Sequence, residues 1–175
     1  MTDATAQTPA GIDLNNPPVA RMLAHFTRDL SFENVAVMEG QPVQGNPQIA
    51  VNVGMDAKSL GEERYQVNMK INAKATGQDK TRFLVELDYA GVFVLQNVKK
   101  EHLHPFLFIE CPRQLLPFAR RVMADVTRDG GYPPLMIDNV DFAALYRQRL
   151  EAARQQQGAA PAEGNDGGAA PMPQA

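Results

Sequence analysis

The stretch that decides the fold is YQVNMKINAK, residues 65–74, in which apolar and polar side chains alternate without a break. A period of two predicts a β-strand with one covered face and one solvated face. Such a strand buries its apolar side only as part of a sheet that packs against a second layer. The apolar side is formed by Tyr65, Val67, Met69, Ile71 and Ala73.

Three flanking stretches, residues 29–33, 49–57 and 83–90, alternate in the same way and predict further strands. Short turn segments at residues 60–61 and 77–78 are typical of antiparallel hairpins. The connection between the first two strands is longer and rich in Gly and Pro, so we expect it to cross over the sheet. The pattern therefore predicts an antiparallel sheet with one solvated face.

In the second half of the chain the apolar period becomes that of an amphipathic helix. Its apolar stripe consists of Leu115, Leu116, Ala119, Val122, Met123 and Val126. We expect Pro117 to bend or restart this helix, and Gly130-Gly131 to end it. A last helix is expected to follow, with Asp138 or Asn139 as its N-cap. Strands followed by helices predict an α+β domain.

The two ends of the chain differ in composition from the middle. Residues 1–19 are polar and contain three prolines, and residues 154–175 consist mainly of Gln, Ala, Gly and Pro. Such segments bury too little apolar surface to offset the entropy of ordering them. We therefore expect a flexible N-terminal lead, one folded domain at residues 20–153, and a disordered C-terminal tail.

Charge and apolar content exclude several classes of protein. A chain of 175 residues with 44% hydrophobic content supports one core, and its formal net charge of -3 lacks the basic face that nucleic-acid binding needs. The sequence contains neither a recognisable secretory signal nor an apolar run long enough to span a bilayer, which predicts no membrane insertion. Its single cysteine forms no disulfide within the chain. We expect a soluble protein of the cytoplasm.

Residues that carry enzyme chemistry are sparse. His102 and His104 lie near Glu101 and Cys111, but this spacing matches no common zinc-ligand pair, so we predict surface histidines and no metal. Cys111, followed by Pro112 at an expected helix start, is a conceivable nucleophile beside a histidine; a small buried side chain is the interpretation we favour. No Gly-rich phosphate loop is present, so we expect no ATP site, no cofactor and no enzymatic activity.

Five stretches of this sequence together resemble the SecB family of protein-export chaperones. They are FTRDLSFE (26–33), FLVELDYAGVF (83–93), CPRQLLPFAR (111–120), GYPPLMI (131–137) and NVDFAALY (139–146). The resemblance implies a four-stranded antiparallel sheet with helices packed on one face, and a homotetramer built as a dimer of dimers. It also implies a cytoplasmic chaperone that holds precursor proteins unfolded without hydrolysing nucleotide, and passes them to the SecA motor ATPase.

Within this resemblance, the family's docking positions for SecA match Asp29, Glu33, Leu84 and Glu86. Strand alternation independently places Asp29 with Glu33, and Leu84 with Glu86, on the polar side of the sheet. Carboxylates around one exposed leucine suit a basic peptide, because the charges steer it and the leucine anchors it. Solvation of the sheet face is the alternative interpretation.

The resemblance also implies a groove for unfolded clients, formed by the crossover at residues 41–47, the strand at 49–53 and the last helix. Candidate groove residues are Ile49, Val51, Phe142 and Tyr146, with core packing as the alternative for each. We expect Val85, Leu87 and Tyr89 to pack against helices at the subunit interface. The main alternative function is a small apolar-ligand binding domain, in which the sheet and a helix enclose a cavity.

Overall fold

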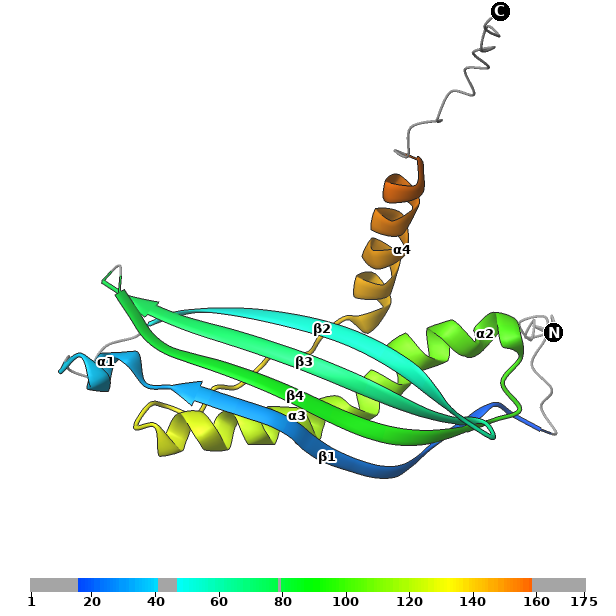
Figure 1. Ribbon diagram of the computed structural model, residues 1–175, viewed down its shortest axis with the longest axis horizontal. Helices are drawn as coiled ribbons and strands as arrows, with labels where there is room; N and C mark the ends of the chain where they lie inside the picture. The colour runs from blue at the N-terminus through cyan, green and yellow to red at the C-terminus, as the bar shows by residue number, and fades with distance from the viewer. Residues whose placement is uncertain (1–15, 41–46, 79, 159–175) are drawn as a thin grey trace, which may run out of the picture.

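The computed structural model describes residues 16–40, 47–78 and 80–158, so most of the predicted lead and tail lies outside the described residues. One sheet is covered by helices that follow it in the chain (Figure 1), which confirms the predicted α+β class. The strands are β1 (Val19–Glu33), β2 (Gln48–Gly61), β3 (Arg64–Gly77) and β4 (Lys80–Gln96). The helical elements are α1 (Val35–Met38), α2 (Lys100–Pro105), the π-helical η1 (Phe106–Glu110), α3 (Cys111–Asp129) and α4 (Phe142–Gly158).

The four strands lie in the order β1-β4-β3-β2, and each neighbouring pair is antiparallel. β1 and β2 form opposite edges of the sheet, so the chain between them crosses over, as its length predicts. The turn between β2 and β3 is tight because Glu62 and Glu63 have positive φ angles of 52° and 58°. Such angles match the twist of the paired strands in a two-residue hairpin.

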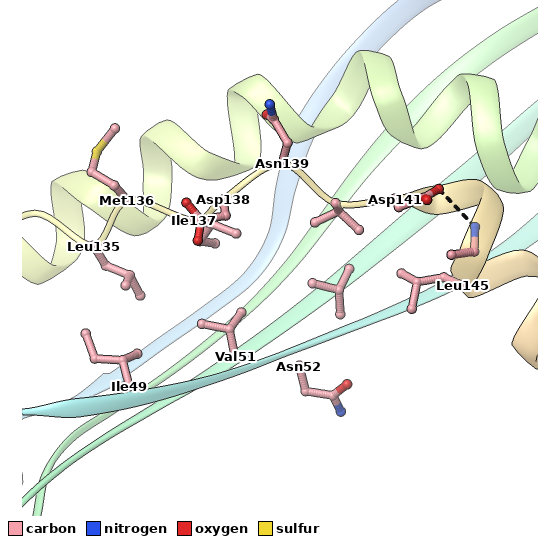
Figure 2. Close-up of a pocket in the computed structure, with 13 residues that line it drawn as sticks. Ile49, Val51, Asn52, Leu135, Met136, Ile137, Asp138, Asn139, Asp141 and Leu145 are labelled. Carbon is pink, nitrogen blue, oxygen red and sulfur yellow. Dashed lines mark hydrogen bonds between the residues drawn. The ribbon is translucent and has the colours of Figure 1, made fainter.

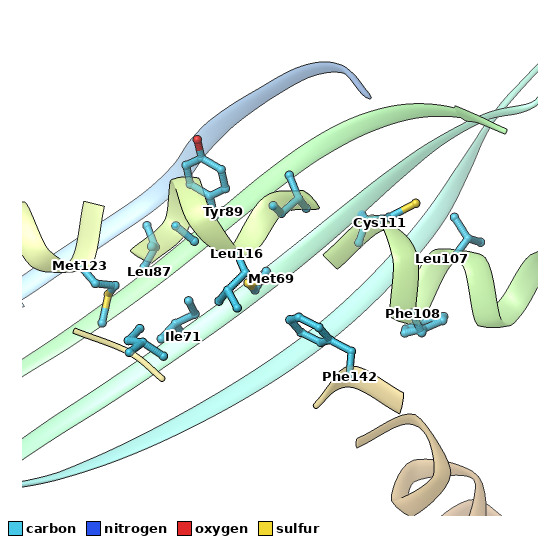
Figure 3. Close-up of a cluster of buried hydrophobic side chains, with 14 of the residues drawn as sticks. Met69, Ile71, Leu87, Tyr89, Leu107, Phe108, Cys111, Leu116, Met123 and Phe142 are labelled. Atoms are coloured by element: carbon cyan, nitrogen blue, oxygen red, sulfur yellow. The ribbon is translucent and has the colours of Figure 1, made fainter. Parts of the chain in front are cut away.

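Helix α3 lies along one face of the sheet and supplies the second layer of the core (Figures 1 and 3). Met69 and Ile71 of β3 are 0% exposed, and so are Leu115 and Met123 of α3 in the same apolar cluster. Burying each such side chain contributes roughly 1.5–3 kcal/mol. The unbroken alternation of β3 therefore determines which face of the sheet receives the helix.

Three residues of β4 belong to this core and not to an open surface. Val85, Leu87 and Tyr89 are only 1%, 1% and 5% exposed, and they pack in the cluster that includes α3. The expectation that they form a subunit interface is therefore wrong, because elements of the same chain already cover them. Periodicity identified the apolar face of β4 but could not tell whether the helix on it came from the same subunit.

The irregular part of the helical run lies earlier than predicted. The sequence predicts a bend or restart at Pro117, but α3 continues through this exposed residue. The change in helical winding is η1, which directly follows Pro105 at the end of α2. Proline lacks the N–H that continues the hydrogen-bond ladder, and a π-helical turn is one way in which a helix absorbs such an interruption.

Strand β1 is much longer than the short stretch that alternation predicts at residues 29–33. The register of β1 against β4 shifts between Met22 and Ala24, and again between Thr27 and Asp29. Each shift turns the following side chains to the other face, so no single period of two runs through the strand. The missing period explains why the first ten residues of β1 escaped prediction.

Helix α4 is capped by a different residue from those predicted. The Asp141 Oδ1 accepts a hydrogen bond of 3.0 Å from the Ala144 N–H, whereas Asp138 and Asn139 precede the helix. Asp141 is therefore the N-cap. The helix also continues beyond the predicted domain boundary at residue 153 and ends at Gly158.

Candidate functional site

An apolar groove lies between the edge strand β2 and the irregular segment that joins α3 to α4. Its volume is about 680 Å³, and its β2 side is formed by Ile49, Val51 and Val53. Leu135 and Ile137 of the connecting segment lie across from them; Figure 2 shows Leu135 and Ile49 pointing toward one another. Because β2 is an edge strand, one side of the groove is closed by loop and helix and not by another strand.

The apolar groove continues into a second hollow of about 290 Å³ that shares Ile49, Leu135 and Met136 with it. This second hollow adds the rings of Phe83 and Tyr132. Its further lining residues are Pro47, Pro133 and Pro134. The two hollows together form an elongated apolar surface of the kind that accommodates an extended chain.

Tyr132 is fixed in place at the end of this surface by its hydroxyl. The Tyr132 Oη donates to the Asn34 Oδ1 at 3.0 Å and lies 3.1 Å from the Arg82 carbonyl oxygen. Asn34 in turn donates to the Gly130 carbonyl oxygen at 2.8 Å. These bonds tie the end of β1 to the end of α3, so the aromatic end of the groove is rigid.

Only two of the four predicted groove residues line this groove. Ile49 and Val51 do so, and they are 40% and 39% exposed. Phe142 is 1% exposed in the main core, which corrects its assignment to the groove. The Tyr146 hydroxyl lies 3.0 Å from the His104 Nδ1, and its ring packs near Phe108, away from the groove lining. The predicted crossover residues 41–46 lie outside the described residues.

Sequence reasoning missed the groove residues Leu135, Ile137 and Leu145. The apolar run in the stretch PPLMID is too short to predict a strand, and its two prolines favour a loop. Three consecutive apolar residues in a loop were nevertheless a usable signal, because Leu135 and Ile137 are each only 7% exposed. Figure 2 shows Met136, between them, pointing away from β2.

The opposite, outward face of the sheet carries the predicted acidic cluster, which we call the acidic face (Asp29, Glu33, Leu84, Glu86). In the β1–β4 register Glu33 lies opposite Leu84, Ser31 opposite Glu86, and Asp29 opposite Asp88. Residues directly opposite one another in a ladder share a face. The three carboxylates of the acidic face are exposed and Leu84 is partly exposed, so the predicted grouping exists on the surface.

A shallow hollow and an ion pair lie next to the residues of the acidic face. A hollow of about 250 Å³ beside Leu84 and Glu86 is also lined by Lys74 and Asn72 of β3. The neighbouring Asp88 pairs with Arg28 at 3.2 Å, so its charge is largely balanced within the chain. The unbalanced carboxylates therefore surround one apolar side chain and a shallow depression.

Comparison with known proteins identifies the family of this chain. A family model described as preprotein translocase subunit SecB matches residues 13–153 of this chain. The chain belongs to the SecB family. Curated proteins named protein-export protein SecB are 47% identical in a Jannaschia species, over 90% of this chain and 97% of that protein, and 49% identical in Dinoroseobacter shibae, over 82% and 86%. A third, from Rhodopseudomonas palustris, is 47% identical over 89% of this chain and 98% of its own length.

A solved structure shares the fold of this SecB-family chain. The SecB-like chaperone of Mycobacterium tuberculosis, in complex with an antitoxin peptide, superposes with a TM-score of 0.57 over 70% of this chain and 91% of that one. Its sequence identity is only 14%, so the likeness concerns the fold. The family and the fold together identify a chaperone of protein export. None of the described helices is both long and apolar enough to cross a bilayer.

The histidines and the cysteine of this SecB-family chain lie in structural settings. Cys111 is 0% exposed, and burial, with a smaller contribution from Glu110, raises the pKa of its thiol to about 12. The thiol is therefore protonated at neutral pH and is a poor nucleophile. His102 lies 3.5 Å from the Glu101 carboxylate. In the described part of the chain, no three His, Cys, Asp or Glu side chains group closely enough to hold a metal ion.

Proposed function

We propose that this chain holds unfolded secretory precursors in the cytoplasm by binding their apolar segments in the apolar groove, and delivers them to the SecA motor ATPase. The observation that carries the proposal is the groove of about 680 Å³ along an exposed strand edge in a SecB-family chain. Its β2 wall is aliphatic and partly exposed, so it accepts many apolar sequences, while Asn52, Asp138, Asn139 and Asp141 add polar groups to the lining. A related SecB-like chaperone was solved with a peptide, which supports the same role here.

Holding a client in this way needs neither nucleotide nor a catalytic residue. Several weak apolar contacts along an extended segment together give useful affinity, because the second and later contacts form within one complex. The buried, protonated Cys111 supports a function without covalent chemistry. We therefore propose that the chain is not an enzyme.

The experiment that tests the groove replaces Ile49 and Val51 with serine and measures suppression of aggregation of a denatured precursor. Each side chain has about 40% of its surface exposed and available to a client. Burying that surface against a client contributes on the order of 1 kcal/mol per side chain. The double variant should therefore bind the denatured precursor at least about tenfold more weakly. Leu60→Ser is the matched control, since Leu60 lies on the same strand with 42% exposure but outside the groove. Equal holding by the double variant and by the wild type contradicts the client role.

The same experiment separates the chaperone from a small-ligand binding protein. A groove of this volume also has the size of a small-molecule site. If one apolar dye per subunit binds the groove while denatured precursors bind undiminished in the presence of saturating dye, the groove serves a small ligand and not clients. Competition between dye and precursor is the result expected for a client groove.

We propose that SecA docks on the acidic face. The exposed carboxylates Asp29, Glu33 and Glu86 suit a basic segment, and Leu84 beside the hollow of about 250 Å³ suits one apolar side chain of that segment. The acidic face lies on the outward side of the sheet, and the apolar groove lies on the covered side at the β2 edge. This arrangement supports docking while a client is still bound.

We also propose that the chain assembles as a homotetramer, a dimer of dimers, through β1 and not through the buried residues of β4. β1 is an edge strand, with β4 as its one neighbour among the described strands, and it carries large apolar side chains with 40–47% exposure. These side chains are Val19, Leu23, Phe26 and Leu30. Sedimentation of the wild type and of Leu23→Asp tests the assembly; a wild-type monomer at micromolar concentration contradicts it.

A further inference from the structure

Arg149 of α4 reaches back to the edge of β2 and binds its backbone. Its Nη1 donates a hydrogen bond of 2.6 Å to the Met55 carbonyl oxygen. The guanidinium also lies over the ring of Phe108, 5.0 Å from its centroid. Cation–π contacts of this kind, together with a charged donor on a carbonyl, hold a side chain in a defined position. Arg149 therefore fastens α4 at one point of the β2 edge.

The contact at Met55 reveals which backbone groups of β2 point away from the sheet. In an antiparallel ladder, alternate residues turn both N–H and C=O toward the neighbouring strand, and the residues between them turn both groups away. The Met55 carbonyl receives Arg149, so it points outward. The register with β3 has no shift from Gln48 to Ser59. Ile49, Val51 and Val53 share the parity of Met55, and their N–H and C=O groups point outward as well.

Ile49, Val51 and Val53 are also the β2 residues whose side chains form the wall of the apolar groove. No described strand lies beyond β2. An extended apolar segment beside β2 thus meets unpaired backbone groups and apolar side chains on the same three residues. These are the two components of recognition by strand addition, in which ladder bonds supply affinity and alternate pockets select side chains.

We propose that a client segment adds to the edge of β2 between Gln48 and Gly54, and that Arg149, seated on Met55, ends this edge. The inference rests on the proposed client role of the apolar groove. Figure 1 shows α4 leaving the sheet beside β2, and Arg149 is the side chain that extends from this helix to the edge just past Gly54. The partner is an extended peptide with apolar residues at alternate positions. At roughly 3.3 Å per residue, about seven residues fill the open edge.

The test measures how affinity changes when a bound peptide is lengthened. A peptide of about seven residues with alternating apolar side chains is compared with versions that carry about four more residues at either end. In the wild type, at least one of the two extensions should change Kd by less than about twofold, because Arg149 blocks its path. In Arg149→Ala that same extension should tighten binding roughly fivefold to thirtyfold, from one or two ladder bonds of about 1 kcal/mol each.

Two variants control for charge and for helix stability. Arg147→Ala removes an exposed positive charge from the same helix and should leave the length dependence at its wild-type value. Arg149→Lys keeps a cationic donor near Met55 and should retain most of the block. A uniform loss of affinity for all peptide lengths in Arg149→Ala assigns Arg149 a purely structural role and overturns the inference, as does an unchanged length dependence.

A second measurement needs no protein variant. Two versions of the short peptide are N-methylated, one at its odd-numbered and one at its even-numbered backbone amides. Methylation of the set that faces β2 should weaken binding to the wild type at least about tenfold, and methylation of the other set should have little effect. Equal effects of the two sets overturn strand addition. If no peptide binds, or if Ile49→Ser with Val51→Ser leaves peptide binding intact, the proposed client groove fails. A failure of the Arg149 test alone leaves that groove standing.

Discussion

Reversal of one charge on the acidic face, Glu86→Lys, should separate delivery to SecA from the holding of clients. Glu86 is exposed and lies opposite Ser31 on β1 and Asn72 on β3. No ion pair joins it to another described residue. Its replacement therefore leaves no partner unpaired within the subunit, and we expect the free energy of unfolding to change by less than about 0.5 kcal/mol.

The effect on docking follows from the exposure of Glu86. A lysine or arginine of the docked segment about 4 Å away gains roughly 1 kcal/mol from one carboxylate in water. Loss of this attraction alone weakens binding about fivefold, and full replacement by an equal repulsion weakens it about thirtyfold. Since the face is solvated, the difference between variant and wild type should shrink as salt is raised from about 0.05 to about 0.5 M.

The assay compares the binding of two partners to the same protein preparation. One is a denatured precursor, and the other is the basic SecA segment proposed to dock on the acidic face, called the SecA tail. Glu151→Lys is the matched control, because it makes the same charge change at an exposed position on α4. Glu86→Lys should lose tail binding between about fivefold and thirtyfold while precursor binding stays within about twofold. Tail binding that is unchanged in Glu86→Lys, or equally reduced in Glu151→Lys, refutes a specific role for the acidic face.

Three further predictions concern stability. In a urea titration, Gly130→Ala should lower the free energy of unfolding by about 1–3 kcal/mol, because a methyl group there overlaps the ring of Phe32. Gly54→Ala is the control: the nearest contact of its methyl group would be the Lys70 Cβ at 4.0 Å, so this variant should be neutral or stabilising. Burial raises the pKa of the Cys111 thiol from 9.0 to about 12. The contribution of this thiol to stability is therefore complete below pH 9.0 and is lost as the pH rises toward 12. The loss of stability at alkaline pH should be smaller in Cys111→Ala than in the wild type, and an identical loss in both contradicts this role of the thiol. Asp141→Ala removes the N-cap of α4 and should cost about 1 kcal/mol, seen as faster amide exchange in the first turn of that helix.

The sequence predicts the middle of the sheet well because β3 obeys one simple rule. Every second side chain from Tyr65 to Ala73 is apolar, and the register with β4 has no shift over that stretch. Period and pairing then agree, so the covered face is unambiguous. β1 obeys the same physics, but its two register shifts exchange the faces within one strand. Alternation alone cannot reveal a strand whose faces exchange.

The apolar groove was harder to predict than the acidic face for a different reason. The acidic face is built from paired strands, so parity along each strand was enough to group Asp29 with Glu86. The groove joins β2 to a loop that follows α3, and no periodicity relates Val51 to Leu135. Phe142 illustrates the difficulty, because the cap at Asp141 starts the helix with this ring buried in the core. A shift of one residue in the helix start changes which side chains face inward.

The apolar groove and the acidic face lie on opposite faces of the same sheet, and this limits how one surface can affect the other. Odd-numbered residues of β2 turn inward to the groove, whereas the acidic face is carried by the outward parity of β1 and β4 at the opposite edge. Val51 and Asn52 of β2 line both the groove and the hollow beside Leu84, but between the groove and the three carboxylates lies a packed sheet whose β3 residues are among the most buried of the chain. A close-packed layer resists local deformation, so occupancy of the groove should reach these carboxylates only through movement of whole elements. SecA docking on a subunit with an empty groove should then be nearly as tight as docking on a loaded one, and any large difference must arise from contacts between SecA and the client itself.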